Sequence, residues 1–478
     1  MTFIRSMLLS ALVAAVLCGA GVFENGALAA PRAHHHHLLR VQWMRSYAAP
    51  GTPARFDRVG VLKIGSPRAR NVLVFEPGTS AGSAYIVPFA QWLVKRLPGW
   101  QVWSVERRQN LLEDQSVLTA AKQGRAGATQ VFDYYLGWTV DHSIRHHIRI
   151  PPAGADAFAK AWGLNVAMQD LHVVIKAARR LGGKVVLSGH SLGGALVTAY
   201  ATWNFHGHPG ADDLAGLVFD DGASFRPAVP VSQARSDLAA LEAPAASPWG
   251  GVSSGSIPAP FLGLFSTTGA LAAVTAADQP SLGAKVLPPS LTPPVPLSNL
   301  ALFAWNTNVS TSRLGKSDFA ILAHEGRGIS ARTRHGVHLW NAHGALTPPK
   351  RWATMLSGAG VANADGVEWY FPYRLTLDIS DGLGNGLPNP AQAVLGLHAT
   401  MGAHLPHRLL MYAFGAALGQ GIVQATKQLA RQSHIPARNL SLIDAFPRYA
   451  HNDPAGAFPK NLFFSGLVRF LERVSAAG

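Results

Sequence analysis

The chain has 478 residues, with 41 Lys and Arg against 26 Asp and Glu, and its formal net charge is +15. The charges are scattered, and basic and aromatic residues do not interleave as they do in nucleic-acid-binding motifs, so we expect no nucleic-acid partner. A basic surface of this kind favours peripheral contact with the anionic surfaces of a cell envelope.

The first 30 residues have the form of a secretory signal peptide. Arg5 precedes an apolar stretch over 7–20, and the small residues at 27–30 are typical of a cleavage site. An uncleaved anchor is disfavoured because the apolar stretch is short for a bilayer span. We therefore expect an exported protein, secreted or held in the periplasm or cell envelope. The only cysteine, Cys18, lies in this leader, so we expect no disulfide and no thiolate ligand after cleavage.

Short apolar runs and helical patterns alternate from residue 71 onward, after an N-terminal extension over 31–70. Such alternation is typical of a parallel sheet covered by helices. The predicted strands are 71–76, 101–106, 184–188, 214–219, 408–414 and 439–443. The predicted helices are 84–97, 157–181, 192–203, 422–432 and a terminal helix that includes 467–474. This order predicts an α/β fold with a doubly wound, mostly parallel sheet.

Residues 225–404 differ in composition from the rest of the chain. Pro, Ala, Gly and Ser dominate there, and periodic segments are scarce. A loop of that length without structure of its own is uncommon in a compact domain. We therefore interpret 225–404 as an inserted cap with short helices, which divides the core into 71–224 and 405–478.

The pattern G-x-S-x-G occurs three times, around Ser80, Ser191 and Ser253. A nucleophilic serine needs an exposed hydroxyl, which a sharp turn from a strand into a helix supplies. Ser253 has no strand before it and prolines soon after it, so we interpret it as a loop serine. Ser191 stands between strand 184–188 and helix 192–203, with the small neighbours that such a turn requires. Ser191 is therefore the predicted nucleophile, and Ser80, also between a strand and a helix, is the second candidate.

The letters GHSLGG at 189–194 resemble the nucleophile elbow of the α/β-hydrolase superfamily, in its lipase and esterase-like branch. The resemblance covers roughly 71–224 and 405–475, about half of the chain. It implies an α/β-hydrolase fold with a large inserted cap, and a serine nucleophile with a histidine base and an acid.

The resemblance also implies an oxyanion hole made by two backbone N–H groups. One is that of Leu192, at the start of the helix after the elbow, and the other is that of Thr79, in the loop after the first predicted strand. Relatives often carry a His-Gly pair before the second donor, whereas this chain has Pro77 and Gly78. Oxyanion donors of this kind are worth about 3 to 4 kcal/mol each in the transition state.

The family places its histidine after the last strand, and three histidines follow residue 405. His451 lies between strand 439–443 and the terminal helix, so the resemblance implies that it is the general base. His407 and His434 are expected at the surface or in turns. His190, inside the elbow, is expected to pack beside the nucleophile with its ring directed elsewhere.

The acid has two candidates at the end of one strand. The loop over 415–421, where many relatives carry the acid, contains no carboxylate, but Asp220 and Asp221 follow strand 214–219. We prefer Asp221, because Gly222 after it permits a turn at the edge of the sheet, and we keep Asp220 as the alternative. Other carboxylates that remain open for the role are Asp378, Asp381, Asp444 and Asp453.

We expect no cofactor and no metal. No phosphate-binding glycine motif stands between a strand and a helix. Asp141, His142, His146 and His147 are close in sequence, but a supporting set of ligands for zinc is not evident.

These features predict an exported serine hydrolase that cleaves a small-molecule or lipid ester through an acyl-enzyme. Aromatic residues of the cap would roof its site and favour an apolar acyl chain, namely Trp249, Phe261, Phe265, Phe303 and Trp305. Two alternatives stay open: a cell-envelope acyltransferase on the same fold, and a non-catalytic hydrolase-like binding protein.

Overall fold

The computed structural model describes residues 38–152, 154–224, 226–250, 258–313 and 321–477. The predicted signal peptide, Cys18 and Ser253 lie outside the described residues. Within the described ranges, every helix is too short or too polar to cross a bilayer.

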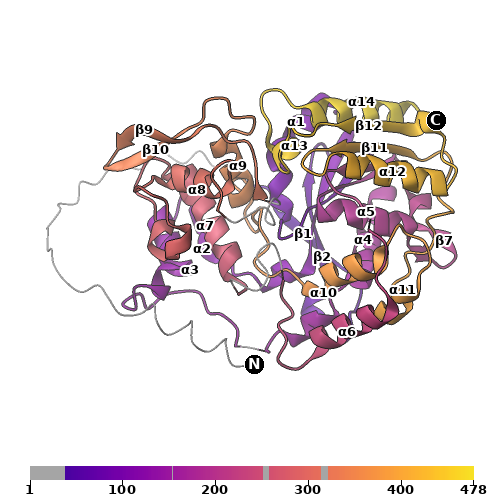
Figure 1. Cartoon of the computed structure of the whole chain (residues 1–478), viewed down its shortest axis with the longest axis horizontal. Coiled ribbons are helices and arrows are strands. Elements are labelled where there is room, and N and C mark those ends of the chain that lie inside the picture. Colours follow the sequence, from indigo (N-terminus) through magenta and orange to yellow (C-terminus); the bar gives the residue numbers. More distant parts are fainter. Residues whose placement is uncertain (1–37, 153, 225, 251–257, 314–320, 478) are drawn as a thin grey trace. The chain divides into compact units, whose positions relative to one another are not determined.

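An eight-stranded sheet lies at the centre of the described chain, with the strand order β1-β2-β4-β3-β5-β8-β11-β12 (Figure 1). β2 is antiparallel to both of its neighbours, and every pair from β4 to β12 is parallel. The predicted mostly parallel sheet is therefore confirmed. Its strands are β1 (Val41–Arg45), β2 (Arg58–Ile64), β3 (Asn71–Glu76), β4 (Trp100–Glu106), β5 (Val185–His190), β8 (Gly216–Asp220), β11 (Leu410–Gly415) and β12 (Leu440–Asp444).

The segment 31–70, predicted only as an extension, contributes two strands to this sheet. β1 and β2 form an antiparallel pair at one edge, in which Val41 lies opposite Leu62. Gly60 interrupts the apolar pattern of β2, and a side chain there would collide with Val41 and Glu106 of the neighbouring strands. The close approach of three strands explains why a glycine stands inside a strand, where it is otherwise unfavourable.

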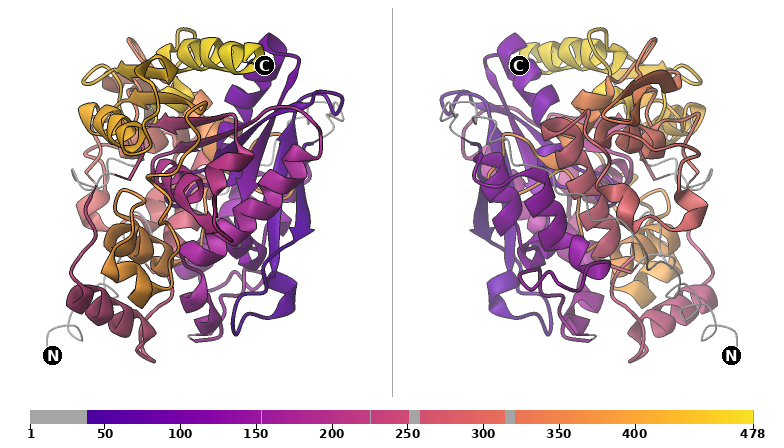
Figure 2. Two further views of the ribbon diagram at one scale, coloured as in Figure 1. Left: turned by 90° about the vertical axis from the view of Figure 1, so that its right-hand side faces the viewer. Right: turned by 90° about the vertical axis from the view of Figure 1, so that its left-hand side faces the viewer.

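Helices cover both faces of the sheet. One face packs against α4 (Leu164–Arg179), α5 (Leu192–Thr202) and α12 (Gln420–Gln432), and the other packs against α1 (Val87–Arg96) and α14 (Leu462–Ala476). Figure 1 shows α14 and α12 on opposite sides of β11 and β12. In Figure 2 the yellow helix α14 lies beside the dark purple part of the core, where Phe89 of α1 stacks on Phe464 at 4.4 Å. The predicted doubly wound arrangement is confirmed.

Two predicted helices begin later than expected. The pattern over 84–97 starts as the 3-10 turn η2 (Ser83–Ile86) before α1, and the pattern over 157–181 is divided at Gly163. A side chain on Gly163 would collide with the carboxylate of Asp378, which accepts a hydrogen bond from the N–H of Leu164 at 2.8 Å. Asp378 therefore holds the N-terminus of α4 from another part of the chain.

The segment predicted as a cap contains two groups of elements. The first lies toward one end of Figure 1 and comprises α7 (Phe261–Thr275), α8 (Asn299–Thr307), α9 (Pro349–Ser357) and the hairpin of β9 (Gly328–Arg334) and β10 (Val337–Asn341). The second packs on the helical layer of the core and comprises α6 (Val231–Glu242), α10 (Tyr373–Asp378) and α11 (Pro390–Leu395). Part of 225–404 thus supports the sheet and does not roof it.

The remaining elements are short. They include the helices α2 (Ser116–Lys122), α3 (Ala128–Tyr135) and α13 (Asp453–Gly456), and the small ribbon of β6 (Asn204–Phe205) and β7 (His208–Pro209). α3 packs against α7, and α13 directly follows the loop that carries His451.

Candidate active site

Ser191 lies at the sharp turn between β5 and α5. Its backbone has φ 57° and ψ −125°, a conformation that residues with a side chain rarely adopt. The chain can bend so tightly because side chains are absent where strand and helix touch. A side chain on Gly189 would collide with the carbonyl oxygen of Gly193, and one on Gly194 would collide with that of Gly222. The small residues around Ser191 in the sequence are therefore required by backbone contacts.

His451 and Asp221 form a buried hydrogen-bonded pair. The Nδ1 of His451 lies 2.6 Å from Oδ2 of Asp221, and both side chains are fully buried. Since a carboxylate is an acceptor, Nδ1 of His451 carries the proton of this hydrogen bond, and Nε2 is the ring nitrogen that can act as a base. This is the arrangement that an acid needs in order to orient a histidine base.

Three backbone N–H groups hold the carboxylate of Asp221. Oδ1 accepts from Ala416 at 2.7 Å and from Leu418 at 3.0 Å, and Oδ2 accepts from Ala417 at 3.0 Å. These donors belong to the loop after β11, the loop in which the sequence shows no carboxylate. That loop therefore supplies the donors that fix the carboxylate of Asp221, which itself follows the end of β8.

Asp220 has a different environment from its neighbour. Its side chain is fully buried, and neither oxygen has a hydrogen-bond partner among the described residues. Burial, reinforced by the charge of Asp221, raises the pKa of Asp220 well above its usual range. Of the two aspartates predicted for the role of the acid, the structure brings Asp221 to His451. Asp220 contributes its backbone oxygen, which accepts from the N–H of Ser191 at 3.0 Å.

His190 links the elbow to the loop of His451, a contact that the sequence did not indicate. Its Nε2 donates to the backbone oxygen of His451 at 2.9 Å, and the two rings lie 4.5 Å apart. Burial, together with the charge of His451, lowers the pKa of His190 to about 3. His190 is thus a neutral donor whose other nitrogen faces the hydroxyl of Tyr85 at 3.4 Å. The ring of His190 is thus directed at the backbone of His451 and at Tyr85, in line with the expectation that it packs beside the nucleophile.

The two predicted oxyanion donors lie on segments that touch. A side chain on Gly193, in the first turn of α5, would collide with the backbone oxygen of Glu76, and one on Gly78 would contact Cβ of Ser191 at 3.0 Å. Among the described residues, no acceptor bonds the backbone N–H of Thr79 or of Leu192. Donors of this kind are what the predicted oxyanion hole requires.

Arg107 holds the loop that carries Thr79, and sequence reasoning missed this residue. Its guanidinium donates to the backbone oxygens of Pro77 and Gly78, the latter at 3.3 Å, and it forms an ion pair with Glu368 at 3.0 Å. Arg107 is 7 % exposed, so the cation is buried and paired. The feature of the sequence that could have indicated this role is the pair of arginines at 107 and 108, directly after a buried strand.

The other carboxylates considered for the acid have partners of their own. Asp453 accepts from Nδ1 of His324 at 2.5 Å, from the hydroxyl of Thr347 at 2.7 Å and from the N–H of Ala450 at 2.7 Å. This network ties the loop of His451 to the cap, and the hydrogen bond to Asp453 raises the pKa of His324. Of the remaining acids, Asp378 accepts from the guanidinium of Arg374. Asp381 accepts from the hydroxyl of Ser380, and Asp444 accepts from the side-chain amide of Gln420.

Three other residues considered in the sequence take no part in the pair of His451 and Asp221. His407 and His434 are exposed. Ser80 lines the same cavity as Ser191 but lies in the loop after β3, where its backbone oxygen accepts from the N–H of Glu368 at 2.9 Å. In the described part of the chain, no group of three or more His, Cys, Asp or Glu side chains is placed to hold a metal ion.

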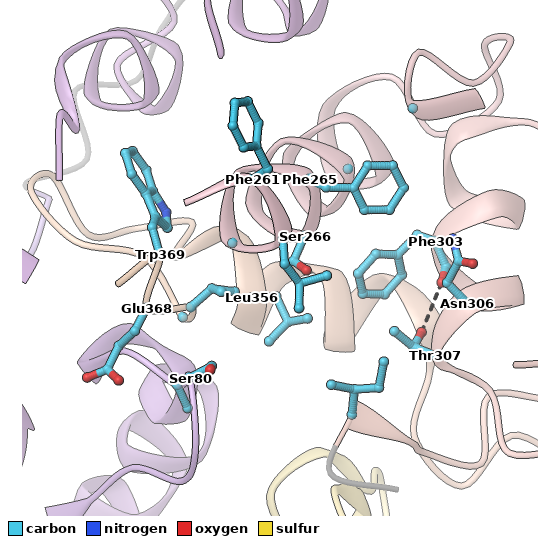
Figure 3. A pocket seen from close by; sticks show the side chains of 18 of the residues that line it. Ser80, Phe261, Phe265, Ser266, Phe303, Asn306, Thr307, Leu356, Glu368 and Trp369 are labelled. Carbon is cyan, nitrogen blue, oxygen red and sulfur yellow. Dashed lines mark hydrogen bonds between the residues drawn. The ribbon is translucent and has the colours of Figure 1, made fainter. Parts of the chain in front are cut away.

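A cavity of about 450 Å³ opens beside Ser191. The core lines one end of it with the loop from Gly78 to Ala81, with Ser191 and with Asn452. Much of the remaining lining comes from α7, α8 and α9 of the cap and from the segments 281–291 and 366–371. Figure 3 shows that Phe261, Phe265 and Phe303 come from these cap helices, while Ser80 comes from the core. The volume falls in the range of small-molecule sites, about 300–1,000 Å³.

No protein-family model matches the chain, and no curated protein matches it by sequence. Solved structures do match. A soluble variant of monoglyceride lipase from Saccharomyces cerevisiae, in complex with a substrate analog, is 9 % identical with a TM-score of 0.36, and the match covers 94 % of this chain and 99 % of that chain. A highly thermostable carboxyl esterase from Bacillus coagulans, in complex with glycerol, is 10 % identical with a TM-score of 0.38, and the match covers 91 % and 99 %.

A thioesterase domain from the curacin biosynthetic pathway is 11 % identical with a TM-score of 0.37, and the match covers 91 % of this chain and 99 % of that chain. The assignment of the fold depends on the chain's own architecture. β2 is the antiparallel strand of an otherwise parallel central sheet, β3 and β4 exchange places in the strand order, and a strained serine follows β5. The chain therefore has the fold of the α/β-hydrolase superfamily.

Proposed function

We propose that this protein is an exported serine hydrolase that cleaves carboxylic esters through an acyl-enzyme. The observation that carries the proposal is the hydrogen bond of 2.6 Å between His451 and Asp221. His190, which precedes Ser191 at the strained turn, bonds the backbone oxygen of the same histidine. A base oriented by a buried carboxylate, close to a serine on an elbow, is the arrangement that activates a hydroxyl.

In the proposed reaction, Oγ of Ser191 attacks the ester carbonyl while Nε2 of His451 takes its proton. The N–H groups of Thr79 and Leu192 stabilise the oxyanion. The proton then passes from His451 to the leaving alkoxide, the C–O bond breaks, and an alcohol departs. Water next attacks the acyl-enzyme, His451 takes its proton and returns it to Ser191, and the carboxylic acid leaves.

The test is Ser191→Ala assayed with p-nitrophenyl butyrate, with Ser80→Ala as the matched control because Ser80 lines the same cavity. We expect Ser191→Ala to lose turnover and labelling by a fluorophosphonate probe, and Ser80→Ala to be labelled. Labelling is read by intact mass. Undiminished turnover by Ser191→Ala would refute the assignment.

The same reagents separate the alternatives. An acyltransferase would form a new ester when an alcohol acceptor is added, whereas a hydrolase releases the free acid. A non-catalytic binding protein would not react with the probe at Ser191. Export is tested separately, by N-terminal sequencing of the mature protein from the producing cell, which should begin close to residue 31.

A further inference from the structure

Helix α7 turns a mostly apolar face, with one serine, toward the cavity. Leu262, Phe265, Ser266 and Gly269 line it, and their spacing of three and four residues places them on one side of the helix. These four residues are half-buried, whereas Leu264 on another face is fully buried. A helix with apolar residues on its cavity side as well as on its packed side is not suited to contact with water on the cavity side.

Helix α8 lines the cavity next to α7, and its polar side chains there are already bonded. Asn299 donates to the backbone oxygen of Ala276 at 2.9 Å, Asn306 donates to that of Leu302 at 3.1 Å, and Thr307 donates to that of Phe303 at 3.0 Å. Their hydrogen-bonding groups support the cap itself. What α8 offers to a ligand is therefore mainly Leu302 and Phe303, the latter visible at the cavity in Figure 3.

The described lining carries almost no charge. It includes no Lys, Arg or Asp, and Glu368 bonds both Arg107 and Gln109 at 3.0 Å. A ligand carboxylate or phosphate in the cap region would meet no described cation, and burying an unpaired charge is strongly unfavourable. The cavity therefore favours neutral ligands.

Gly269 leaves open space in the middle of α7. A side-chain carbon added there would have no atom within 4 Å, although the position lines the cavity. Glycine in the interior of a helix is less favourable than alanine, so its presence calls for a reason in packing or binding. Here the neighbours leave free volume, and a bound ligand is the group that would use it.

We propose that the substrates are neutral esters with a long apolar chain, that this chain lies along α7 and α8, and that Gly269 leaves the room it needs. The proposal rests on the proposed ester hydrolysis and adds the class of substrate. Each methylene buried along these helices raises kcat/KM by about fourfold until the cavity is filled.

The experiment compares wild type, Gly269→Leu and Gly421→Leu on p-nitrophenyl acetate, butyrate and octanoate. Gly421 is the matched control, because it is a glycine of α12 that also has no atom near an added side-chain carbon and does not line the cavity. We expect Gly269→Leu to lower the ratio of octanoate to acetate turnover by about 10-fold or more. Gly421→Leu should keep the wild-type ratio.

Two further series identify the chain and test neutrality. Alkyl acetates of increasing length show whether the alcohol part, and not the acyl part, lies along the helices. An ester whose acyl chain ends in a carboxylate should react far more slowly than its uncharged analogue of equal length. Equal rates for that pair would overturn the neutral class.

A readout without catalysis separates this inference from the proposed function. Ser191→Ala should bind methyl decanoate more weakly when Gly269→Leu is added, as measured by calorimetry. If wild type hydrolyses acetate and reacts with the fluorophosphonate, but chain length and Gly269→Leu change nothing, the inference is wrong and the proposed function stands. If no ester is cleaved and the probe does not react, the proposed function fails and the substrate class fails with it, and the binding measurement then decides only whether an apolar chain lies along α7 and α8.

Discussion

Nδ1 of His451 lies 2.6 Å from Oδ2 of Asp221, and the neighbouring Asp220 has no hydrogen-bond partner among the described residues. The two aspartates are adjacent in sequence yet have opposite environments, because Asp220 ends β8 while Asp221 turns the chain with a φ of 42°. One side chain therefore meets the histidine and the N–H groups of the loop after β11, and the other remains in the apolar interior.

We predict that Asp221→Asn lowers kcat for ester hydrolysis by about 10⁴-fold, because an amide in place of the carboxylate fails to hold His451 in the tautomer with a basic Nε2. Asp220→Asn is the matched control and should retain the wild-type kcat. Steady-state assays with p-nitrophenyl butyrate measure both. Similar losses in the two variants would contradict the assignment of Asp221.

Asp220→Asn should instead change how stability depends on pH. Because the pKa of Asp220 is raised in the folded protein, the folded state binds more protons than the unfolded state above the unfolded pKa of about 3.9. Asp220 therefore destabilises the fold increasingly as the pH rises above that value. The melting temperature of Asp220→Asn relative to wild type should increase between pH 5 and pH 8. A constant difference over that range would show that Asp220 is not the cause.

His190→Phe tests the link between the elbow and the base. Phenylalanine keeps a ring beside His451 but removes the donor to its buried backbone oxygen, and an unsatisfied buried group costs about 1–3 kcal/mol. If that cost displaces the imidazole, kcat falls by about 10- to 100-fold. Tyr85→Phe is the control, because it removes a hydroxyl that faces the other nitrogen of His190 at 3.4 Å and keeps the donor to His451. An unchanged kcat in His190→Phe would show that the contact is dispensable.

His324→Gln should remove a stabilising contribution that is present at acidic pH. The hydrogen bond to Asp453 raises the pKa of His324, so the folded state favours the protonated ring. This contribution is complete below the unfolded pKa of about 6.5 and is lost as the pH rises through the raised folded value. Melting curves should show a larger deficit for His324→Gln at pH 5.5 than at pH 9.

Thr347→Val is the control for that experiment, because Thr347 bonds the same carboxylate but does not titrate. Its deficit should be equal at the two pH values. A pH-dependent deficit in Thr347→Val would mean that Asp453 itself, and not His324, causes the effect.

The parallel strands were predictable because they are buried on both faces and are therefore continuous apolar runs. β3 matches its prediction at both ends, and the others differ by a few residues at their ends. β1 was missed because it is a short, partly exposed edge strand, whereas β2 lies inside the sheet and was missed because Gly60 and Lys63 interrupt its apolar run. In β1 only Val41 is fully buried, and β2 contains a glycine. Periodicity in the sequence does not reveal such strands.

At the candidate site, the local motif was predictable and the long-range contacts were not. The strained turn at Ser191 follows from glycines within five residues, all visible in the sequence. The partner of His451 depends on a contact between residues 230 positions apart, so the sequence left Asp220 and Asp221 open. Arg107, His324 and the ring of His190 act through contacts with residues far away in the sequence, which no spacing rule records.

One end of the cavity is formed by core residues that follow the strands, among them Ser191. The long wall is formed by the inserted segment, so the two parts come from separate stretches of the chain. Mutations in 261–307 can therefore change the wall of the cavity while Ser191, His451 and Asp221 stay in place. A library confined to the cavity-facing positions of α7 and α8 would explore selectivity with the reactive geometry held constant.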